Sequence, residues 1–247
     1  MTRLPGALKK AWPMRSSLLL ALIGVILGGS PILSAAASEA TPPQVLREIE
    51  PTFPSDPQRP GLDGVVVADI IVMANGRVAE AWPIAYTDRL FGSHAVDALL
   101  EWTFRPASQN GKKIPYMVQA PVIFHHGPKE PIWPFGEEMI RLQRAIDRFF
   151  RLAAGKMTGA APAIDAEPRA SDRLWFELSV TGNQIQAGLE VPSRDPEANQ
   201  MLGYLQRYLV LRPPSSGFVS SVQSYKKITV SAPRLKFLRT AEADRVK

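Results

Sequence analysis

Alternation of apolar and polar residues predicts a β-hairpin in each half of the chain. In the first half, Val65–Met73 (VVVADIIVM) is rich in β-branched residues, and Asn75-Gly76 follows it as a two-residue turn signal. The return strand is expected over Arg77–Ile84. In the second half, Leu174–Val180 places its apolar residues on one face, and the alternation resumes after a turn at Gly182-Asn183.

Helical spacing of apolar residues predicts a helix after each hairpin and a longer helix between the halves. Ser93 can cap a helix that ends near Trp102, and Asp195 can cap another with Pro196 at its first position. Residues 136–154 are interpreted as an amphipathic connecting helix, with a membrane-surface helix as the weaker alternative because acids are mixed among its arginines. Residues 154–171, rich in Ala, Gly and Pro, are typical of a linker.

A further strand is expected over Ile114–Phe124, and its prolines indicate which side of it is open. Pro115 and Pro121 lie six positions apart, so their nitrogens face the same side and leave the hydrogen-bond ladder there incomplete. This free edge could receive a partner strand, be protected by its prolines from unwanted pairing, or meet the second half of the chain. The predicted partner-strand edge consists of Ile114, Pro115, Met117, Gln119, Pro121 and Ile123.

The two halves share one order of elements: strand, tight turn, strand, helix and an Arg-Pro pair. A constant offset of 107 residues aligns Asn75 with Gly182 and Arg105 with Arg212, and it aligns both hairpins and both helices without a gap. Because the identity between the halves is low, both a true duplication and a chance similarity of two β-β-α units stay open.

Five separated segments of the first half occur in an order typical of one known domain family. They are an aromatic–Pro pair, a Gly-x-acid-Gly motif at 61–64, a hairpin at 75–78, a W-x-F-x-P-A motif at 102–107, and a closing strand over 110–124. Together they resemble the TonB C-terminal domain family, and the second half matches it only by layout and Arg212-Pro213. The signature positions, which we expect to be mainly structural, are Phe53, Pro54, Gly61, Gly64, Asn75, Gly76, Trp102, Phe104, Arg105 and Pro106.

The resemblance implies a small domain in which a helix packs on an antiparallel sheet. Well-known members bind extended peptides of outer-membrane transporters by strand addition, and they deliver work from a proton-driven complex through a membrane helix that bears a histidine. Here the apolar segment 16–33 has no histidine, and the long proline-rich spacer of that family is missing. The resemblance therefore favours the binding role over energy transduction.

The predicted fold class is α+β, with two tandem β-β-α-β units of the TonB C-terminal type joined by an amphipathic helix. The expected organisation is a signal peptide or short N-terminal anchor at 1–37, a TonB C-terminal-like domain at 46–126, the connecting helix at 136–154, and a degenerate second unit at 172–233.

The N-terminal segment has the layout of a secretory signal peptide. Basic residues precede an apolar run, Leu18–Leu27, which is followed by helix breakers and small residues, so cleavage after Ala37 or Ala40 is expected. The alternative is an uncleaved anchor over 16–33, which would add an inner-membrane association. Both alternatives place the remaining chain in the periplasm, because the positive charges stay on the cytoplasmic side.

Composition and charge narrow the chemistry. The absence of cysteine excludes disulfides, thiolate nucleophiles and cysteine-ligated metals. The net charge is +6, but Arg3, Lys9, Lys10 and Arg15 precede Ala37, which leaves 25 bases against 23 acids, or +2, and removes support for a nucleic-acid partner. The three histidines fall in no known catalytic or metal-binding motif, so we expect no enzyme, no metal and no cofactor.

The sequence therefore predicts a periplasmic binding module that captures an extended segment of an envelope or outer-membrane protein by strand addition. Two alternatives stay open: a structural or interaction protein whose two units pair with each other, and an anchored energy transducer for outer-membrane transport. A homodimer is a further state that the sequence leaves open.

Overall fold

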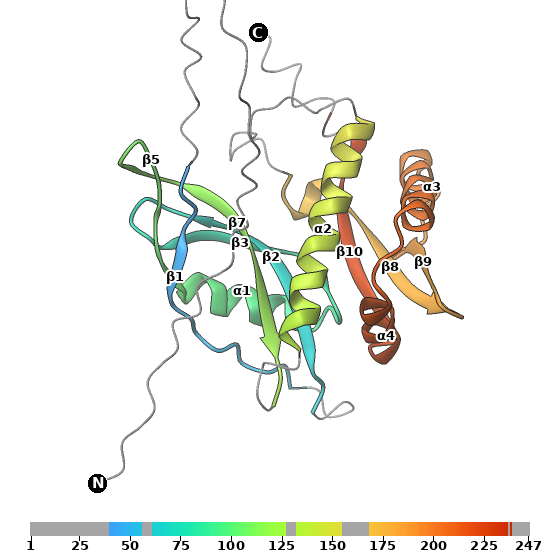
Figure 1. The fold of residues 1–247 in the computed structure, drawn as a ribbon, viewed down its shortest axis with the longest axis horizontal. Coiled ribbons are helices and arrows are strands. Elements are labelled where there is room, and N and C mark those ends of the chain that lie inside the picture. Colours follow the sequence, from blue (N-terminus) through green and yellow to red (C-terminus); the bar gives the residue numbers. More distant parts are fainter. Residues whose placement is uncertain (1–39, 56–60, 127–131, 155–167, 237, 239–247) are drawn as a thin grey trace, which may run out of the picture. The chain divides into compact units, whose positions relative to one another are not determined.

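The computed structural model describes residues 40–55, 61–126, 132–154, 168–236 and 238, which all belong to one structural unit (Figure 1). The expected signal peptide or anchor at 1–37 and most of the expected linker at 154–171 lie outside the described residues. Within the described ranges, no helix combines the length and apolar character that crossing a membrane requires.

A single six-stranded sheet runs through both halves of the described chain. Its strand order is β7-β2-β3-β10-β8-β9, and every neighbouring pair is antiparallel. The two halves meet where β10 pairs with β3, so the expected units share one sheet. The strands are β2 (Gly64–Val72), β3 (Val78–Tyr86), β7 (Tyr116–Phe124), β8 (Arg173–Thr181), β9 (Gln184–Leu189) and β10 (Lys227–Pro233).

Four short strands form two small ribbons beside this sheet. β1 (Gln44–Arg47) pairs with β4 (Thr103–Arg105), and β5 (Ala107–Gln109) pairs with β6 (Lys112–Ile114). The strand expected over Ile114–Phe124 is therefore interrupted at Pro115. Proline has no N–H to donate to a strand ladder. Pro115 therefore separates β6, which pairs with β5, from β7, which pairs with β2.

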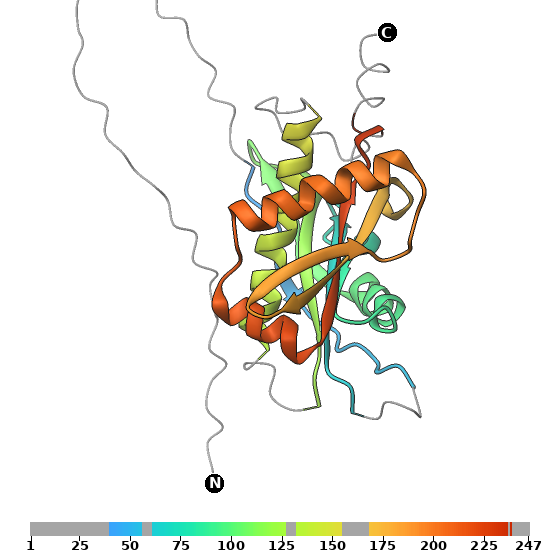
Figure 2. The same cartoon turned by 90° about the vertical axis from the view of Figure 1, so that its right-hand side faces the viewer.

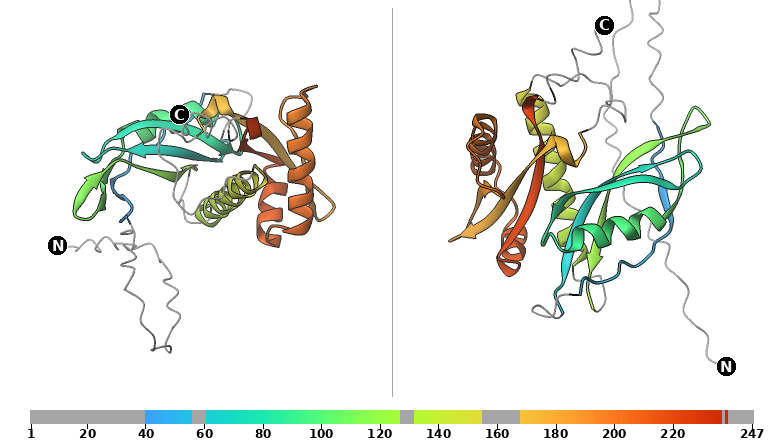
Figure 3. Two further views of the ribbon diagram at one scale, coloured as in Figure 1. Left: turned by 90° about the horizontal axis from the view of Figure 1, so that it is seen from above. Right: turned by 180° about the vertical axis from the view of Figure 1, so that it is seen from behind.

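The helices cover the two faces of the sheet unequally. α1 (Phe91–Glu101) lies on one face, whereas α2, α3 and α4 lie on the other (Figures 2 and 3). The α1 side buries Val66, Ile70 and Leu99, and the opposite side buries Met139 and Met201 with their neighbours. The second face carries α2 (Trp133–Ala153), α3 (Pro196–Leu211) and α4 (Ser216–Ser224), and a short 3-10 turn, η2 (Ala170–Asp172), precedes β8.

The starts of two helices can be compared with the N-cap residues that the sequence predicts. The Asp195 side chain accepts from the Glu197 backbone N–H at 3.0 Å, so the predicted cap of α3 is confirmed. The predicted Ser93 cap is wrong, because α1 begins two residues earlier at Phe91. There the Asp88 carboxylate accepts from the Leu90 N–H at 2.9 Å, in a turn that precedes the helix.

The two halves repeat one local strand order. In each half the third strand lies beside the first strand, and the first lies beside the second: β7-β2-β3 and then β10-β8-β9. Strand directions alternate throughout, so the second half is turned over relative to the first. This agrees with α1 and α3 lying on opposite faces (Figure 3). The recurrence supports a duplication, which stays a proposal.

Candidate strand-binding edge

β7 lies at one end of the sheet and pairs along its full length with β2. The register is continuous over nine residue pairs, from Gly64 opposite Phe124 to Val72 opposite Tyr116. Among the described residues, β7 has no second neighbouring strand. The second half of the chain joins the sheet at β3, so the alternative in which it meets the edge at β7 is not found among the described residues.

Hydrogen bonds of Val65 establish which backbone groups of β7 point away from the sheet. The Thr87 N–H donates to the Val65 carbonyl at 2.9 Å, and the Val65 N–H donates to the Thr87 hydroxyl at 3.0 Å, both toward β3. Since orientation alternates along a strand, Val66 bonds toward β7 and forms the hydrogen-bonded pair with Val122. The same alternation turns the backbone of Met117, Gln119, Pro121 and Ile123 outward. We call these groups the outer edge of β7.

Burial divides β7 into two parts. Ala120–Phe124 is buried, whereas Tyr116–Gln119 is half-buried. On the α2 side, Gly136 faces the Pro121 side chain, and a Cβ at this glycine would lie 3.5 Å from Pro121. Farther along α2, the Arg144 side chain donates to the Gln119 amide oxygen at 3.2 Å. Tyr116–Gln119 is therefore the part of the edge that is more accessible to a partner.

The other predicted edge residues lie elsewhere. Ile114 is the last residue of β6 and pairs with Ala107, so it does not belong to the outer edge of β7. Pro115 separates the two strands. Four of the six predicted residues, Met117, Gln119, Pro121 and Ile123, lie together on the outer edge.

The opposite end of the sheet, β9, is partly occupied from within the chain. The Glu190 N–H donates to the Trp175 carbonyl at 3.1 Å, and by alternation the Ala187 backbone then points away from β8. The Gln206 amide of α3 donates to that Ala187 carbonyl at 3.0 Å. This bond removes one acceptor that a strand added at β9 would need, so β7 is the more suitable edge.

The signature residues position the elements around β7 rather than lining its outer edge. Trp102 is buried, and its indole N–H donates to the Ile49 carbonyl at 2.9 Å, which fixes the extended segment before β2. Phe53 packs edge-on against Phe124, with ring centroids 5.8 Å apart. Gly76 adopts a φ of +82° in the first hairpin, and its carbonyl accepts from the Phe104 N–H at 2.8 Å. The remaining signature residues are Pro54, Gly61, Gly64, Asn75, Arg105 and Pro106, in the same loops and strand ends.

A buried polar network holds the two halves together under α2. The Arg173 guanidinium of β8 donates to Ser231 at 2.7 Å and to Asp147 of α2, and it lies 4.0 Å from Asp69 of β2. Ser231 in turn donates its hydroxyl to the Ile84 carbonyl of β3 at 2.7 Å. The network therefore ties β2, β3, α2, β8 and β10 into one unit.

Burial raises the pKa of the Asp147 carboxyl above its ordinary value of 3.8, and the Arg173 and Arg151 guanidinium groups act in the opposite direction. A raised pKa means that the folded chain binds this proton more tightly than the unfolded chain does. The stability contributed by this group is therefore complete below pH 3.8 and falls as the pH rises through the raised pKa.

We expect Asp147→Asn to remove this pH dependence. Urea unfolding of both proteins from about pH 4 to pH 7 should show the unfolding free energy of the variant gaining on that of the wild type as the pH rises. A difference that stays constant or moves the other way would contradict the assignment.

One cluster of an aspartate and two histidines was not predicted from the sequence. Asp63, in the loop before β2, lies 2.9 Å from His125 Nδ1 and 3.6 Å from His126 Nδ1, just after β7 ends. Both histidines can face one aspartate because they lie beyond Phe124, the last residue of β7, where side chains no longer alternate between two faces. No sequence signal links residues 62 positions apart. Across the part of the chain that the structure describes, no group of three or more His, Asp or Glu side chains could hold a metal ion.

Comparison with known proteins agrees with the first half of this architecture. Residues 49–126 match the model of the family described as Gram-negative bacterial TonB protein C-terminal. These residues form a TonB C-terminal-like domain. The resemblance inferred from the signature motifs is confirmed for this region, whereas the match does not extend to the second half. The predicted α+β class is confirmed by the helices and the antiparallel sheet of the structure itself.

Comparisons with solved structures and with curated proteins give two further findings. The solution NMR structure of the Pseudomonas aeruginosa TonB CTD is 20% identical to this chain, over 39% of this chain and 93% of that one, with a TM-score of 0.29. A search of curated proteins found no match. The TonB C-terminal-like domain ends at 126, so α2, which flanks its outer edge, lies outside it.

Proposed function

We propose that this protein is a non-enzymatic periplasmic binding module that captures an extended segment of an envelope or outer-membrane protein at the outer edge of β7. The observation that carries the proposal is the end position of β7, whose Met117, Gln119 and Ile123 backbone groups point away from the sheet. A strand placed there would gain main-chain hydrogen bonds, and adjacent side chains would supply selectivity. The family of the first domain supports an envelope partner.

The fold bears on the first alternative, an internally paired protein, and not on the second, an anchored energy transducer. The halves do pair with each other, through β3 and β10, so an internally paired protein is compatible with the fold. That pairing uses the far side of the first domain and leaves β7 at the end of the sheet, so it does not compete with strand capture. The anchored energy transducer depends on residues 16–33, which lie outside the described residues.

A proline at position 119 tests strand capture directly. Gln119→Pro removes one outward N–H, while Pro121 shows that the same side of the strand accepts proline. We expect at least about tenfold weaker binding of ten-residue peptides from the periplasm-facing segments of outer-membrane transporters. Titration calorimetry gives the affinity, and amide hydrogen exchange reports whether Met117 and Gln119 become protected when peptide is added.

The matched control is Gln119→Ala, which also loses the contact with Arg144 but keeps the backbone N–H. It should bind peptide within about twofold of wild type, because the main-chain donor is intact. Equal binding by the proline and alanine variants, or peptide binding without protection of Met117 and Gln119, would show that the edge is not the site.

A further inference from the structure

The acidic residues of α2 are engaged within the protein, whereas most of its arginines face solvent. The helix carries four arginines and three acids. The Asp147 carboxylate accepts from the Gln143 amide at 3.1 Å and from the Arg173 guanidinium of β8, on the buried side of the helix. Glu138 turns toward the second half of the chain and accepts from the Ser215 hydroxyl at 2.7 Å. Two of the three acids are therefore held in internal contacts.

The third acid, Glu137, lies in the first turn of the helix and also has partners. It accepts from the Trp133 indole N–H at 3.1 Å and lies 3.9 Å from the Arg141 guanidinium, one helical turn away. Acids mixed among the arginines count against a membrane-surface helix when the sequence is read alone. In the folded helix these acids are separated from the arginines, so that objection no longer applies beyond Glu137.

The solvent side of α2 presents arginines at spacings of three and four residues. Arg141, Arg144 and Arg148 are all exposed. The helical repeat places Leu152, which is 50% exposed, one turn beyond Arg148 on the same side. Arg144 donates to the Gln119 amide, and neither Arg144 nor Arg148 forms an ion pair with any other residue that the structure describes. We call Arg141, Arg144, Arg148 and Leu152 the outer face of α2.

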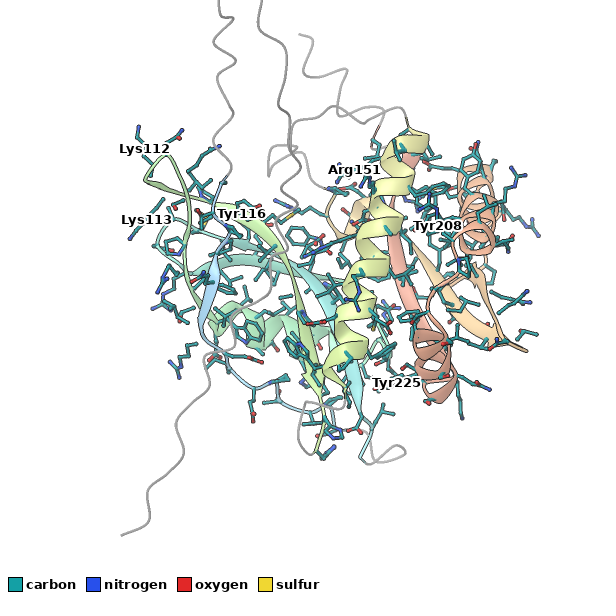
Figure 4. All side chains as sticks on the ribbon, in the orientation of Figure 1. Lys112, Lys113, Tyr116, Arg151, Tyr208 and Tyr225 are labelled. Carbon is teal, nitrogen blue, oxygen red and sulfur yellow. The ribbon has the colours of Figure 1, made fainter. Side chains whose placement is uncertain are left out.

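The segment that leaves α3 runs alongside α2 in the opposite direction. Phe149 of α2 packs on Tyr208 of α3, with ring centroids 4.9 Å apart, and Figure 4 shows Tyr208 on the α3 side of α2. Glu138, about 16 Å earlier along α2, contacts Ser215. Residues 208–215 therefore follow α2 from its C-terminal part back toward its start.

This segment brings a further arginine and a further leucine beside the outer face of α2. Leu211, which is 78% exposed, and Arg212, which is also exposed, lie between the two contacts with α2. The combined surface therefore holds exposed leucines, Leu152 and Leu211, among arginines. Basic residues together with exposed apolar side chains on one side of a helix are typical of segments that lie in a membrane interface.

Charge and shape favour a bilayer as the partner of this surface. An extended peptide needs a strand edge or a groove for its main chain, whereas the exposed side of a helix can lie flat on a bilayer. A guanidinium group matches the geometry of a phosphate oxygen pair, and each arginine near an anionic lipid surface adds to the attraction. The leucines would be covered by the acyl chains beneath the headgroups.

We propose that the outer face of α2, together with Leu211 and Arg212, rests on a bilayer that contains anionic phospholipid. The arginines contact lipid phosphates, and Leu152 and Leu211 enter the boundary between the headgroups and the acyl chains. This surface is separate from the outer edge of β7, and the proposal does not depend on strand capture.

A dye at position 152 tests the docking directly. Because the chain has no cysteine, Leu152→Cys provides one labelling site for an environment-sensitive dye. We expect its fluorescence to shift to the blue with vesicles of phosphatidylcholine containing about 30% phosphatidylglycerol, and the shift to disappear near molar salt. Vesicles of phosphatidylcholine alone should leave the spectrum unchanged. An anchor at residues 16–33 would bind both kinds of vesicle, so the difference between them reports the outer face of α2.

Charge reversal identifies the arginines responsible. In the labelled protein, Arg144→Glu together with Arg148→Glu should raise the lipid concentration needed for half of the shift at least about tenfold, since each basic residue near an anionic surface contributes about fivefold. Arg148→Glu alone, which keeps the contact between Arg144 and Gln119, should weaken binding partway.

The matched control is Lys112→Glu with Lys113→Glu, which changes the net charge equally. Both lysines are exposed, and Figure 4 shows them at the tip of the β5–β6 ribbon, across the first domain from α2. This control should bind within about twofold of the unsubstituted labelled protein. A dye placed at Lys113→Cys should keep its spectrum when vesicles are added, because the ribbon tip does not enter the bilayer.

Four results would overturn the proposal. They are the absence of a shift with phosphatidylglycerol vesicles, equal weakening by the two charge reversals, a shift at position 113 as large as that at position 152, and a shift produced by polyglutamate in solution but not by vesicles. The last would assign the outer face of α2 to an acidic protein. None of these results bears on strand capture at β7, which is measured by amide exchange of Met117 and Gln119.

Discussion

Replacing Arg173 with methionine should lower the unfolding free energy by about 3–5 kcal/mol, the range typical of breaking a buried ion pair by removing one partner. The Arg173 side chain is 1% exposed, and it faces Asp147 and Asp69 from within the core. Without the guanidinium, these two buried acids would lose the cation that lies beside both of them. The Ser231 hydroxyl would also lose a hydrogen bond.

Two further variants identify the cause of the loss. Arg173→Lys keeps a positive charge but lacks the planar fork that reaches Ser231 and Asp147 together, so it should lose less stability than methionine does. Adding Asp147→Asn to Arg173→Met should recover part of the loss, because a neutral amide then replaces the buried carboxylate that has lost Arg173. Urea unfolding monitored by tryptophan fluorescence measures all four proteins. A methionine variant within about 1 kcal/mol of wild type would show that the network is dispensable.

The same network explains why the joined sheet could not be predicted from the sequence. The hairpins, the α3 cap and the α+β class follow from local alternation, turn residues and capping, which act over a few positions. The pairing of β3 with β10 joins residues about 145 positions apart, for example Ala85 with Val230. It depends on polar groups such as Arg173 and Ser231, whose partners become evident only in the fold.

The outer edge of β7 was partly predictable for a physical reason. Proline cannot donate to a ladder, so Pro121 alone indicates which side of the strand lies away from β2. The interruption at Pro115 was missed, because a proline is compatible with both a strand edge and a strand end. The contact between Arg144 and Gln119 could not be predicted, since only the packing of α2 brings these two side chains together.

Helix α4 shows a weaker signal that could have been used. The Ser215 side chain caps it by accepting from the Phe218 N–H at 3.0 Å. Serine is a favoured cap residue, and Phe218, Val219 and Val222 follow at helical spacing and are buried. The nine-residue length left too few turns for the periodicity to stand out.

Gly76→Ala should be the most damaging change in the first hairpin. Gly76 has a φ of +82°, and a Cβ added there would lie 2.1 Å from the Phe104 carbonyl oxygen. The left-handed conformation costs an L-residue about 1–2 kcal/mol, and the overlap with backbone adds about 1–3 kcal/mol, since β4 must shift to relieve it. The variant should therefore lose about 2–5 kcal/mol of unfolding free energy.

Gly182→Ala in the second hairpin separates these two costs. Gly182 also has a positive φ, +63°, but a Cβ there would meet no atom within 4 Å. Its loss should stay near the conformational cost of about 1–2 kcal/mol, so the difference between the two variants measures the approach of the first turn to Phe104. Because that approach holds β4 and the Trp102-x-Phe104 motif against the first hairpin, Gly76→Ala should also raise amide exchange at Phe104, whose N–H donates to Gly76. Equal losses for the two alanine variants would show that the first turn moves freely away from Phe104, and that the glycine is needed for its backbone conformation alone.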